Sequence, residues 1–176
     1  LLRLTGLRGA AARVAASHLI RAHGEHPVLY VTADSRTAES AREALRGLLG
    51  EREDETRLRA FPRHDTLPFD RFSPQPFVVA QRMAVLHELD ALGRGARAPI
   101  VVAPASALSQ RVPARRVLAN TTVRIAIGES LDRDELVARL VAIGYQRMAL
   151  VEEAGEVAVR GDIVDVFPPH LDKPLR

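Results

Sequence analysis

The chain has 176 residues, of which 47% are hydrophobic and 27% charged, so it is long enough and apolar enough to bury an α/β core. It contains no cysteine, which excludes disulfides and thiolate metal sites, and no apolar run reaches the roughly 20 residues that a membrane span requires. Its formal charge of +3 is spread over many basic and acidic residues and gives little support for nucleic-acid binding. Because no signal-peptide layout opens the chain, we expect a cytoplasmic protein without a membrane partner.

The first two thirds of the chain alternate between helical and extended patterns. Helical spacing predicts helices over Ala10–Ala22, Arg36–Leu49 (capped by Asp34 or Ser35), Val78–Leu92 and, briefly, Ser106–Gln110. Apolar, β-branched runs predict strands over Pro27–Thr32, Leu58–Phe61 and Pro99–Ala103. This alternation indicates a twisted, mostly parallel sheet covered by helices on both faces. Four prolines in the stretch Phe61–Phe77 predict an ordered, extended loop.

The pattern changes near Asn120. Period-two alternation predicts strands over Thr122–Ile127 and Val157–Phe167, the second with a bulge or turn at Gly161, and helical spacing predicts a helix over Asp132–Ile143. We therefore divide the chain into a first domain, residues 1–121, and a second, smaller α/β domain, residues 122–176. The last residues look like the opening of a further strand, so we expect a truncated chain.

A glycine-rich turn lies between the apolar run Leu1–Thr5 and the first helix, where P-loop proteins hold phosphates. A working loop continues after its second glycine with a lysine for the phosphates and a hydroxyl residue for Mg²⁺. Here Ala10 and Ala11 stand in those places, and the only lysine is Lys173. Arg8 or Arg13 could contact an anion without restoring hydrolysis. We therefore predict no ATPase and no cofactor for this chain, and we interpret the turn as a degenerate phosphate-loop position formed by Thr5, Gly6, Arg8 and Gly9.

The remaining polar residues form no convincing reactive set. His23 and His26 flank a turn, which favours a surface loop over a metal site. Asp162 and Asp165 lie three apart on a predicted strand, so they face opposite sides unless a turn redirects them. We predict neither catalytic residues nor a metal site.

Arg160 is the most suggestive basic residue, because it interrupts an apolar strand beside Gly161. A guanidinium backed by a rigid sheet makes a good interface anchor, since its planar fork binds carboxylates through two hydrogen bonds. From the residues alone, a solvated arginine on the outer face of the sheet is the simpler interpretation.

Two blocks resemble a known family, the bacterial transcription-repair coupling factors. The first block, residues 61–74, resembles their Thr-Leu-Pro-Tyr-x-x-Phe-Ser-Pro stretch. The second block, Gly144-Tyr145 followed by residues 151–168, resembles a Gly-Glu-aromatic-Ala-x-Arg-Gly signature that runs on to Asp-x-Phe-Pro and is shared, more loosely, with the repair helicase UvrB. The resemblance covers essentially the whole chain, although Val157 stands where the family usually has an aromatic residue.

The resemblance implies an N-terminal, UvrB-like module. It implies a degenerate RecA-like, parallel-sheet domain into which a smaller α/β domain is inserted, and that second domain is expected to recruit the damage-recognition protein UvrA. Arg160 corresponds to an arginine of the UvrA-binding surface, and Arg176 to a second one. The full protein is expected to bind RNA polymerase and double-stranded DNA through other domains, where a motor uses ATP and Mg²⁺.

Two other functions compete with this interpretation. A fragment of a UvrB-type ATP-dependent DNA repair helicase would require a Gly-Lys-Ser/Thr turn at residues 8–11, which the sequence lacks. A DNA-binding domain would require a basic stripe interleaved with aromatics, yet only 4% of the residues are aromatic.

Overall fold

The computed structural model describes residues 4–50, 57–66, 71, 73–169, 171 and 173–176. The helices are α1 (Ala10–Ala22), α2 (Ser35–Leu49), α3 (Pro76–Ala91), a 3-10 turn η1 (Leu92–Arg94), α4 (Ala105–Leu108), α5 (Arg115–Asn120) and α6 (Arg133–Ala142). The strands are β1 (Val28–Thr32), β2 (Leu58–Ala60), β3 (Ile100–Pro104), β4 (Gln146–Met148), β5 (Glu156–Arg160) and β6 (Ile163–Val166). Among the described residues, no helix combines the length and apolar character needed to cross a bilayer.

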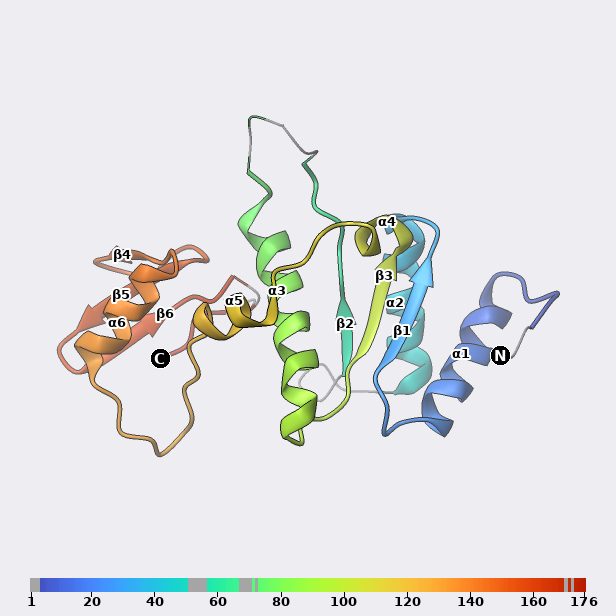
Figure 1. Ribbon diagram of the computed structural model, residues 1–176, viewed down its shortest axis with the longest axis horizontal. Helices are drawn as coiled ribbons and strands as arrows, with labels where there is room; N and C mark the ends of the chain where they lie inside the picture. Colours follow the sequence, from blue (N-terminus) through green and yellow to red (C-terminus); the bar gives the residue numbers. More distant parts are fainter. Residues whose placement is uncertain (1–3, 51–56, 67–70, 72, 170, 172) are drawn as a thin grey trace.

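The first three strands form a parallel sheet in the order β1-β3-β2 (Figure 1). Val28 of β1 and Leu58 of β2 both lie opposite Ile100 of β3. Every residue of the central strand β3 is buried, as expected for a short, continuous apolar run in a parallel sheet. The α/β class predicted from the sequence is therefore confirmed, with one parallel sheet in the first part of the chain.

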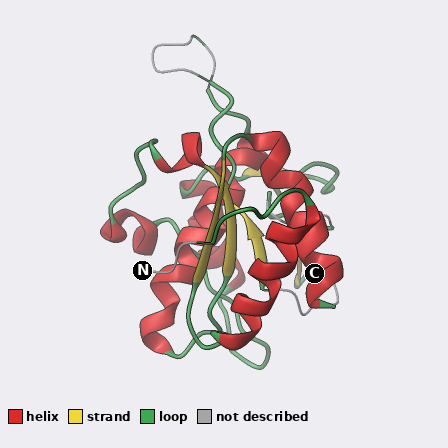
Figure 2. Cartoon of the chain, turned by 90° about the vertical axis from the view of Figure 1, so that its right-hand side faces the viewer, coloured by secondary structure: helices red, strands yellow, loops and turns green. Residues whose placement is uncertain are grey.

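Helices lie on both sides of this sheet (Figure 2). One face packs Ile100 and Val102 against α1 and α2, with Leu45 of α2 completely buried. The other face packs Val101 and Ala103 against Phe61, α3 and α4. The predicted double covering holds for β2 and β3 but fails for β1, whose Leu29 is 53% exposed. An apolar cavity of about 410 Å³ lies beside Leu29, because α3 packs against β2 rather than β1.

Two of the helices, α2 and α6, begin at an aspartate whose side chain caps them. The Asp34 carboxylate accepts a hydrogen bond of 2.7 Å from the backbone N–H of Thr37, and this bond holds the pKa of Asp34 below its ordinary value. The Asp132 carboxylate accepts 2.8 Å from the N–H of Glu135 at the start of α6. Both capped helices therefore follow from local sequence.

The beginning of the proline-rich stretch is held by a buried arginine. The Arg82 guanidinium lies 4.2 Å from the centroid of the Phe61 ring and donates a hydrogen bond of 2.6 Å to the carbonyl of Pro62. The backbone N–H of His64 donates 2.8 Å to the side chain of Gln110. Residues 61–66 thus form the beginning of the predicted loop, whereas residues 67–70 and 72 of the first family block lie outside the described residues.

A second sheet has the order β4-β5-β6, with β4 parallel and β6 antiparallel to β5. The two-residue connection Gly161-Asp162 joins β5 to β6, and Gly161 adopts a φ of 60°, a region that favours glycine. The predicted turn at Gly161 is thus confirmed. Helix α6 packs on one face through Val137 and Leu140.

One expectation for the second part is wrong, and two short elements were missed, α5 in the first part and β4 in the second. The predicted strand over Thr122–Ile127 is wrong: the segment pairs with no other strand, and Ile127 is fully exposed. The short elements α5 and β4 were not predicted. In β4, all three residues are exposed and show no alternation. The division into domains 1–121 and 122–176 stays a prediction.

Candidate partner-binding site

Alternation along the β5–β6 hairpin separates an apolar face from a polar one. The pairs Val157–Val166 and Val159–Val164 face α6 and close a small core with it. Successive residues of a strand point to opposite faces, so Arg160 and Asp165 lie on the face opposite α6. We call the set Arg160, Asp165 and Arg176 the arginine cluster.

The two arginines meet on one carboxylate. The Arg160 Nη2 donates a hydrogen bond of 2.7 Å to Asp165 Oδ2. Arg176 donates 2.7 Å from Nε to Oδ1 and 3.2 Å from Nη2 to Oδ2. Arg176 therefore binds Asp165 with the two-pronged geometry of its guanidinium, while Arg160 makes a single bond.

The hairpin and the chain end bring these side chains together. Asp165 lies opposite Ala158, which places it diagonally from Arg160, within reach of a long side chain. Arg176 follows Leu175, whose backbone exchanges hydrogen bonds of 2.9 and 2.7 Å with Val166. The backbone pairing thus positions both guanidiniums beside the same strand.

Burial and charge differ sharply within the arginine cluster. The Asp165 side chain is only 11% exposed, whereas those of Arg160 and Arg176 are 50% and 64% exposed. Hydrogen bonds from Arg176 and then Arg160 lower the pKa of Asp165 to about 2, so the carboxylate is ionised at neutral pH. Two guanidiniums and one carboxylate leave the cluster with a net charge of +1.

The cluster retains capacity to bind a partner. In the structure, the two guanidiniums donate three hydrogen bonds, all to Asp165. Each guanidinium carries five N–H donors, so most of them point away from Asp165 and remain available to carboxylates of another molecule. The exposed apolar residues Ile163 and Met148 belong to the same sheet, and Ile163 pairs directly with Arg160.

The sequence singled out both arginines but not the residue that joins them. Asp165 was considered only as half of a carboxylate pair with Asp162, and Asp162 instead lies in the turn with a fully exposed side chain. The signal was present in the sequence: once Gly161 is assigned as a turn, the hairpin places Asp165 and Arg160 on one face.

The glycine-rich turn does not build a phosphate site in the described residues. Thr5, Gly6, Arg8 and Gly9 are all exposed and irregular, and no strand is formed at residues 4 and 5, while residues 1–3 lie outside the described part. Arg13 donates a hydrogen bond of 3.0 Å to Ser40 on α2 rather than reaching towards the turn. Figure 1 shows the N-terminus and the C-terminus at opposite ends of the molecule, so this turn is remote from the arginine cluster.

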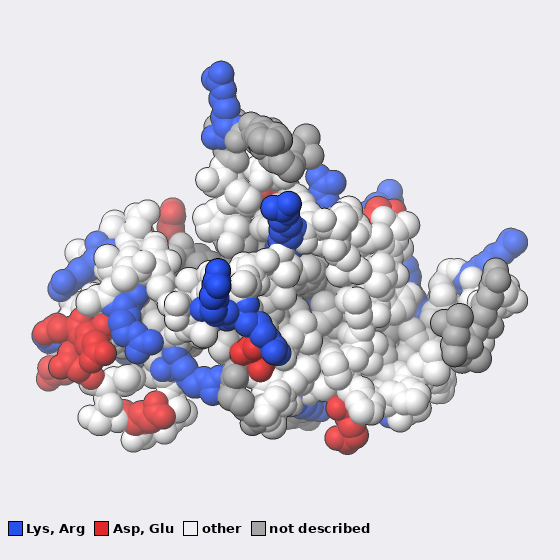
Figure 3. All heavy atoms as spheres, viewed as in Figure 1, with Lys and Arg blue, Asp and Glu red and all other residues white. Residues whose placement is uncertain are grey.

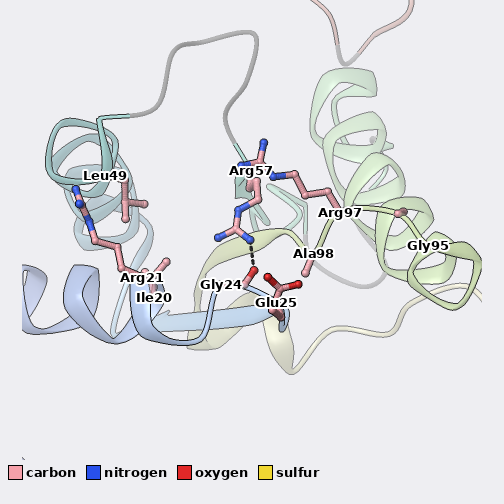
Figure 4. A pocket seen from close by; sticks show the side chains of 10 residues that line it. Ile20, Arg21, Gly24, Glu25, Leu49, Arg57, Gly95, Arg97 and Ala98 are labelled. Atoms are coloured by element: carbon pink, nitrogen blue, oxygen red, sulfur yellow. Dashed lines mark hydrogen bonds between the residues drawn. The ribbon is translucent and has the colours of Figure 1, made fainter.

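One polar cavity lies at the wrong edge of the first sheet for a nucleotide. It has a volume of about 560 Å³ and is lined by Arg21, Arg57 and Arg97 together with Glu25 (Figure 4). These residues surround the amino ends of the strands, whereas ligands of open parallel sheets bind at the carboxyl ends. The cavity beside the carboxyl ends, near Pro104, has only about 180 Å³, less than a typical ligand site.

The charge distribution gives no continuous basic stripe on the face in view. Figure 3 shows Lys and Arg scattered over that face, and the most prominent group of Asp and Glu lies at the end formed by the second sheet and α6. No group of three or more His, Cys, Asp or Glu side chains that could hold a metal occurs within the described ranges.

Residues 123–176 match the UvrB interaction domain family. The chain is 37% identical over 179 residues to the transcription-repair-coupling factor of Myxococcus xanthus, an alignment that covers 99% of this chain and 14% of that protein. It is 30% identical over 173 residues to that of Bacillus subtilis (strain 168), covering 98% and 14%, and 34% identical over 112 residues to that of Escherichia coli (strain K12), covering 64% and 9%. The chain thus spans about one seventh of the length of the first two relatives. The resemblance seen in the two sequence blocks is confirmed, and the chain belongs to the transcription-repair-coupling factor family.

Proposed function

We propose that this chain is the N-terminal module with which a transcription-repair-coupling factor recruits UvrA to stalled RNA polymerase in transcription-coupled nucleotide excision repair. The observation that carries the proposal is the exposed pair of guanidiniums, Arg160 and Arg176, on the sheet of a domain that matches the UvrB interaction domain family. The binding reaction needs no cofactor, because its chemistry is the pairing of charged and apolar surfaces.

The geometry suits a protein partner that presents carboxylates. Arginines on a sheet are held more rigidly than arginines on a loop, which reduces the entropy lost on binding. Apolar neighbours such as Ile163 supply the contact area that excludes water around a charged pair. A partner surface with acidic side chains and an apolar centre is therefore the complement that we propose for UvrA.

The first part of the chain, in this proposal, is a degenerate RecA-like domain that supports the module without hydrolysing ATP. Its parallel sheet with helices on both sides agrees with that ancestry. Ala10 and Ala11 replace the lysine and hydroxyl residues that ATP and Mg²⁺ need, which argues against the alternative, a UvrB-type ATP-dependent helicase fragment. ATP, RNA polymerase and double-stranded DNA are assigned to other domains of the cytoplasmic parent protein.

The test is calorimetric binding of this chain to purified UvrA. Arg160→Ala is expected to weaken binding by about 2 kcal/mol, roughly 30-fold, the typical loss for an arginine at the centre of an interface. Arg139→Ala is the matched control, because Arg139 is an exposed arginine of the same domain but lies on α6, across the sheet from the cluster. Circular dichroism of each variant reports folding.

Each outcome of the calorimetric experiment supports a different explanation. Tight binding that survives Arg139→Ala and is lost in folded Arg160→Ala supports recruitment through the arginine cluster. Equal losses in both variants would point to a general electrostatic attraction, and no binding by the unmodified chain would contradict UvrA recruitment by this chain.

A further inference from the structure

Asp165 is the one residue of the arginine cluster whose presence a simple charge argument does not explain. A surface that attracts an acidic partner gains from every positive charge and loses from every negative one. Asp165 lowers the charge of the cluster from +2 to +1, yet it is 11% exposed and accepts all three of the hydrogen bonds that the guanidiniums donate. A residue that weakens attraction but organises the attracting groups suggests a role in geometry.

Long arginine side chains bind at an entropic cost. A side chain that becomes immobile at an interface loses about 0.5–1.5 kcal/mol of rotamer freedom. A carboxylate that already fixes the guanidinium moves this cost from the binding step to the folding step. Asp165 is well suited to the task, because β6 pairs with β5 along its whole length and the Asp165 side chain is only 11% exposed.

We propose that Asp165 is a positioning residue, which holds the guanidiniums of Arg160 and Arg176 side by side as a preorganised pair of forks for the carboxylates of an acidic protein partner. This inference rests on the proposed function, in which that partner is UvrA. Asp165 acts through the two arginines, and its own carboxylate stays turned towards them.

The two arginines are held unequally. Arg176 uses Nε and Nη2 on the two oxygens of Asp165, whereas Arg160 uses Nη2 alone. The Nε–H of Arg176 is therefore bonded to the carboxylate, while the Nε–H of Arg160 makes no bond to the residues that the structure describes. This difference gives an internal reference for a spectroscopic test.

The binding test separates an effect of charge from an effect of side-chain position, because the two predict opposite changes in affinity for UvrA. Asp165→Asn makes the cluster more positive, so a purely electrostatic role predicts equal or tighter binding to UvrA. The positioning role predicts weaker binding, roughly tenfold, because both guanidiniums lose their fixed geometry. Asp162→Asn is the matched control: it makes the same charge change on the same hairpin, but its side chain is fully exposed and does not contact Arg160 or Arg176.

A double-mutant cycle sharpens the result. Arg160→Ala is expected to weaken binding less in the Asp165→Asn background than in the unmodified chain, because the two residues act as one unit. Weaker binding in Asp165→Asn with normal binding in Asp162→Asn, together with this coupling, supports the proposal. Equal or tighter binding in folded Asp165→Asn overturns it.

Side-chain NMR tests the hydrogen-bond geometry of the arginine cluster independently of UvrA binding. In the unmodified chain, the Nε–H of Arg176 is expected to be shifted downfield and to exchange with water several times more slowly than that of Arg160. The shift should vanish in Asp165→Asn and persist in Asp162→Asn. A normal Arg176 signal in the folded, unmodified chain overturns the positioning role, whereas absent UvrA binding with a shifted signal overturns only the proposed function.

Discussion

The two sheets of this chain differ in how many of their faces carry an apolar cluster. The β1-β3-β2 sheet has apolar clusters on both faces, and its central strand is buried throughout. The β4-β5-β6 sheet has an apolar cluster on the α6 face alone, while its other face carries the arginine cluster. Apart from the uncovered face of β1, the first sheet therefore has little surface left to offer a partner.

We infer from this difference that the first sheet serves mainly stability and the second sheet mainly recognition. Residues of the first sheet contribute hydrophobic burial and can change only within limits of volume. Residues of β5 and β6 are divided by alternation. One set packs on α6, and the other set combines the buried Ala158 and Asp165 with the half-exposed Arg160. Because that core is small and lies on one face only, we expect it to contribute less to stability than the core of the first sheet.

The largest expected effect comes from the two-sided core. Leu45→Ala, at a completely buried position of α2, should destabilise the chain by about 3 kcal/mol through lost burial and a residual cavity. Leu29→Ala, on the uncovered face of β1, should cost less than about 1 kcal/mol. Urea denaturation of both variants measures the difference, and similar losses would contradict the account of β1 as uncovered on one face.

The second effect probes the one-sided core. Val157→Ala, at a completely buried position of β5, should cost about 2 kcal/mol through lost burial and cavity formation. If residues 122–176 form a separate domain, hydrogen exchange should accelerate there and stay unchanged in β1 and β3. Uniform acceleration along the chain would argue against the predicted division after residue 121.

A third, smaller effect concerns the helix that supports the second sheet. Asp132→Ala removes the carboxylate that accepts the N–H of Glu135, and it should cost about 1 kcal/mol, the usual value of an N-cap. Asp132→Ser should recover most of that loss, because serine also caps helices. Thermal unfolding of the two variants gives the measurement; a serine variant as unstable as the alanine variant would exclude capping as the cause.

The smallest effect is a pH dependence of stability. The pKa of Asp165 falls from its ordinary 3.8 to about 2 because Arg176 and Arg160 bind its ionised form. Its contribution to stability is therefore present above about pH 4 and is lost as the pH falls through about 2. The difference in melting temperature between the unmodified chain and Asp165→Asn should shrink between about pH 5 and pH 2, and a constant difference would contradict the ion pairs.

Local sequence predicted the elements that contain their own signals. Helix α1, the Asp34 cap of α2 and the buried strand β3 could be read from spacing, capping and apolar runs. The segment Thr122–Ile127 alternates like a strand but finds no partner strand, so its pattern was misleading. Strand β4 was missed for the converse reason: it forms because β5 offers a free edge, while its own residues are all exposed.

The site was predictable in its parts but not in its arrangement. Resemblance to the family identified Arg160 and Arg176, which are 16 positions apart in the sequence. Their meeting on Asp165 depends on the tight turn at Gly161 and on the backbone pairing of Val166 with Leu175. Tertiary pairing of this kind has no periodicity to reveal it, and only the structure shows that one carboxylate joins both arginines.

The most direct test of the central claim is to ask which sheet UvrA covers. The chain contains no cysteine, so single cysteines can be introduced at two exposed apolar positions, Ile163→Cys on the second sheet and Leu29→Cys on the first. Alkylation of each variant with and without UvrA, followed by mass spectrometry of this chain, measures protection. We expect UvrA to protect the cysteine at position 163 and to leave the one at position 29 reactive. Protection at position 29 alone would contradict binding of UvrA through the second sheet.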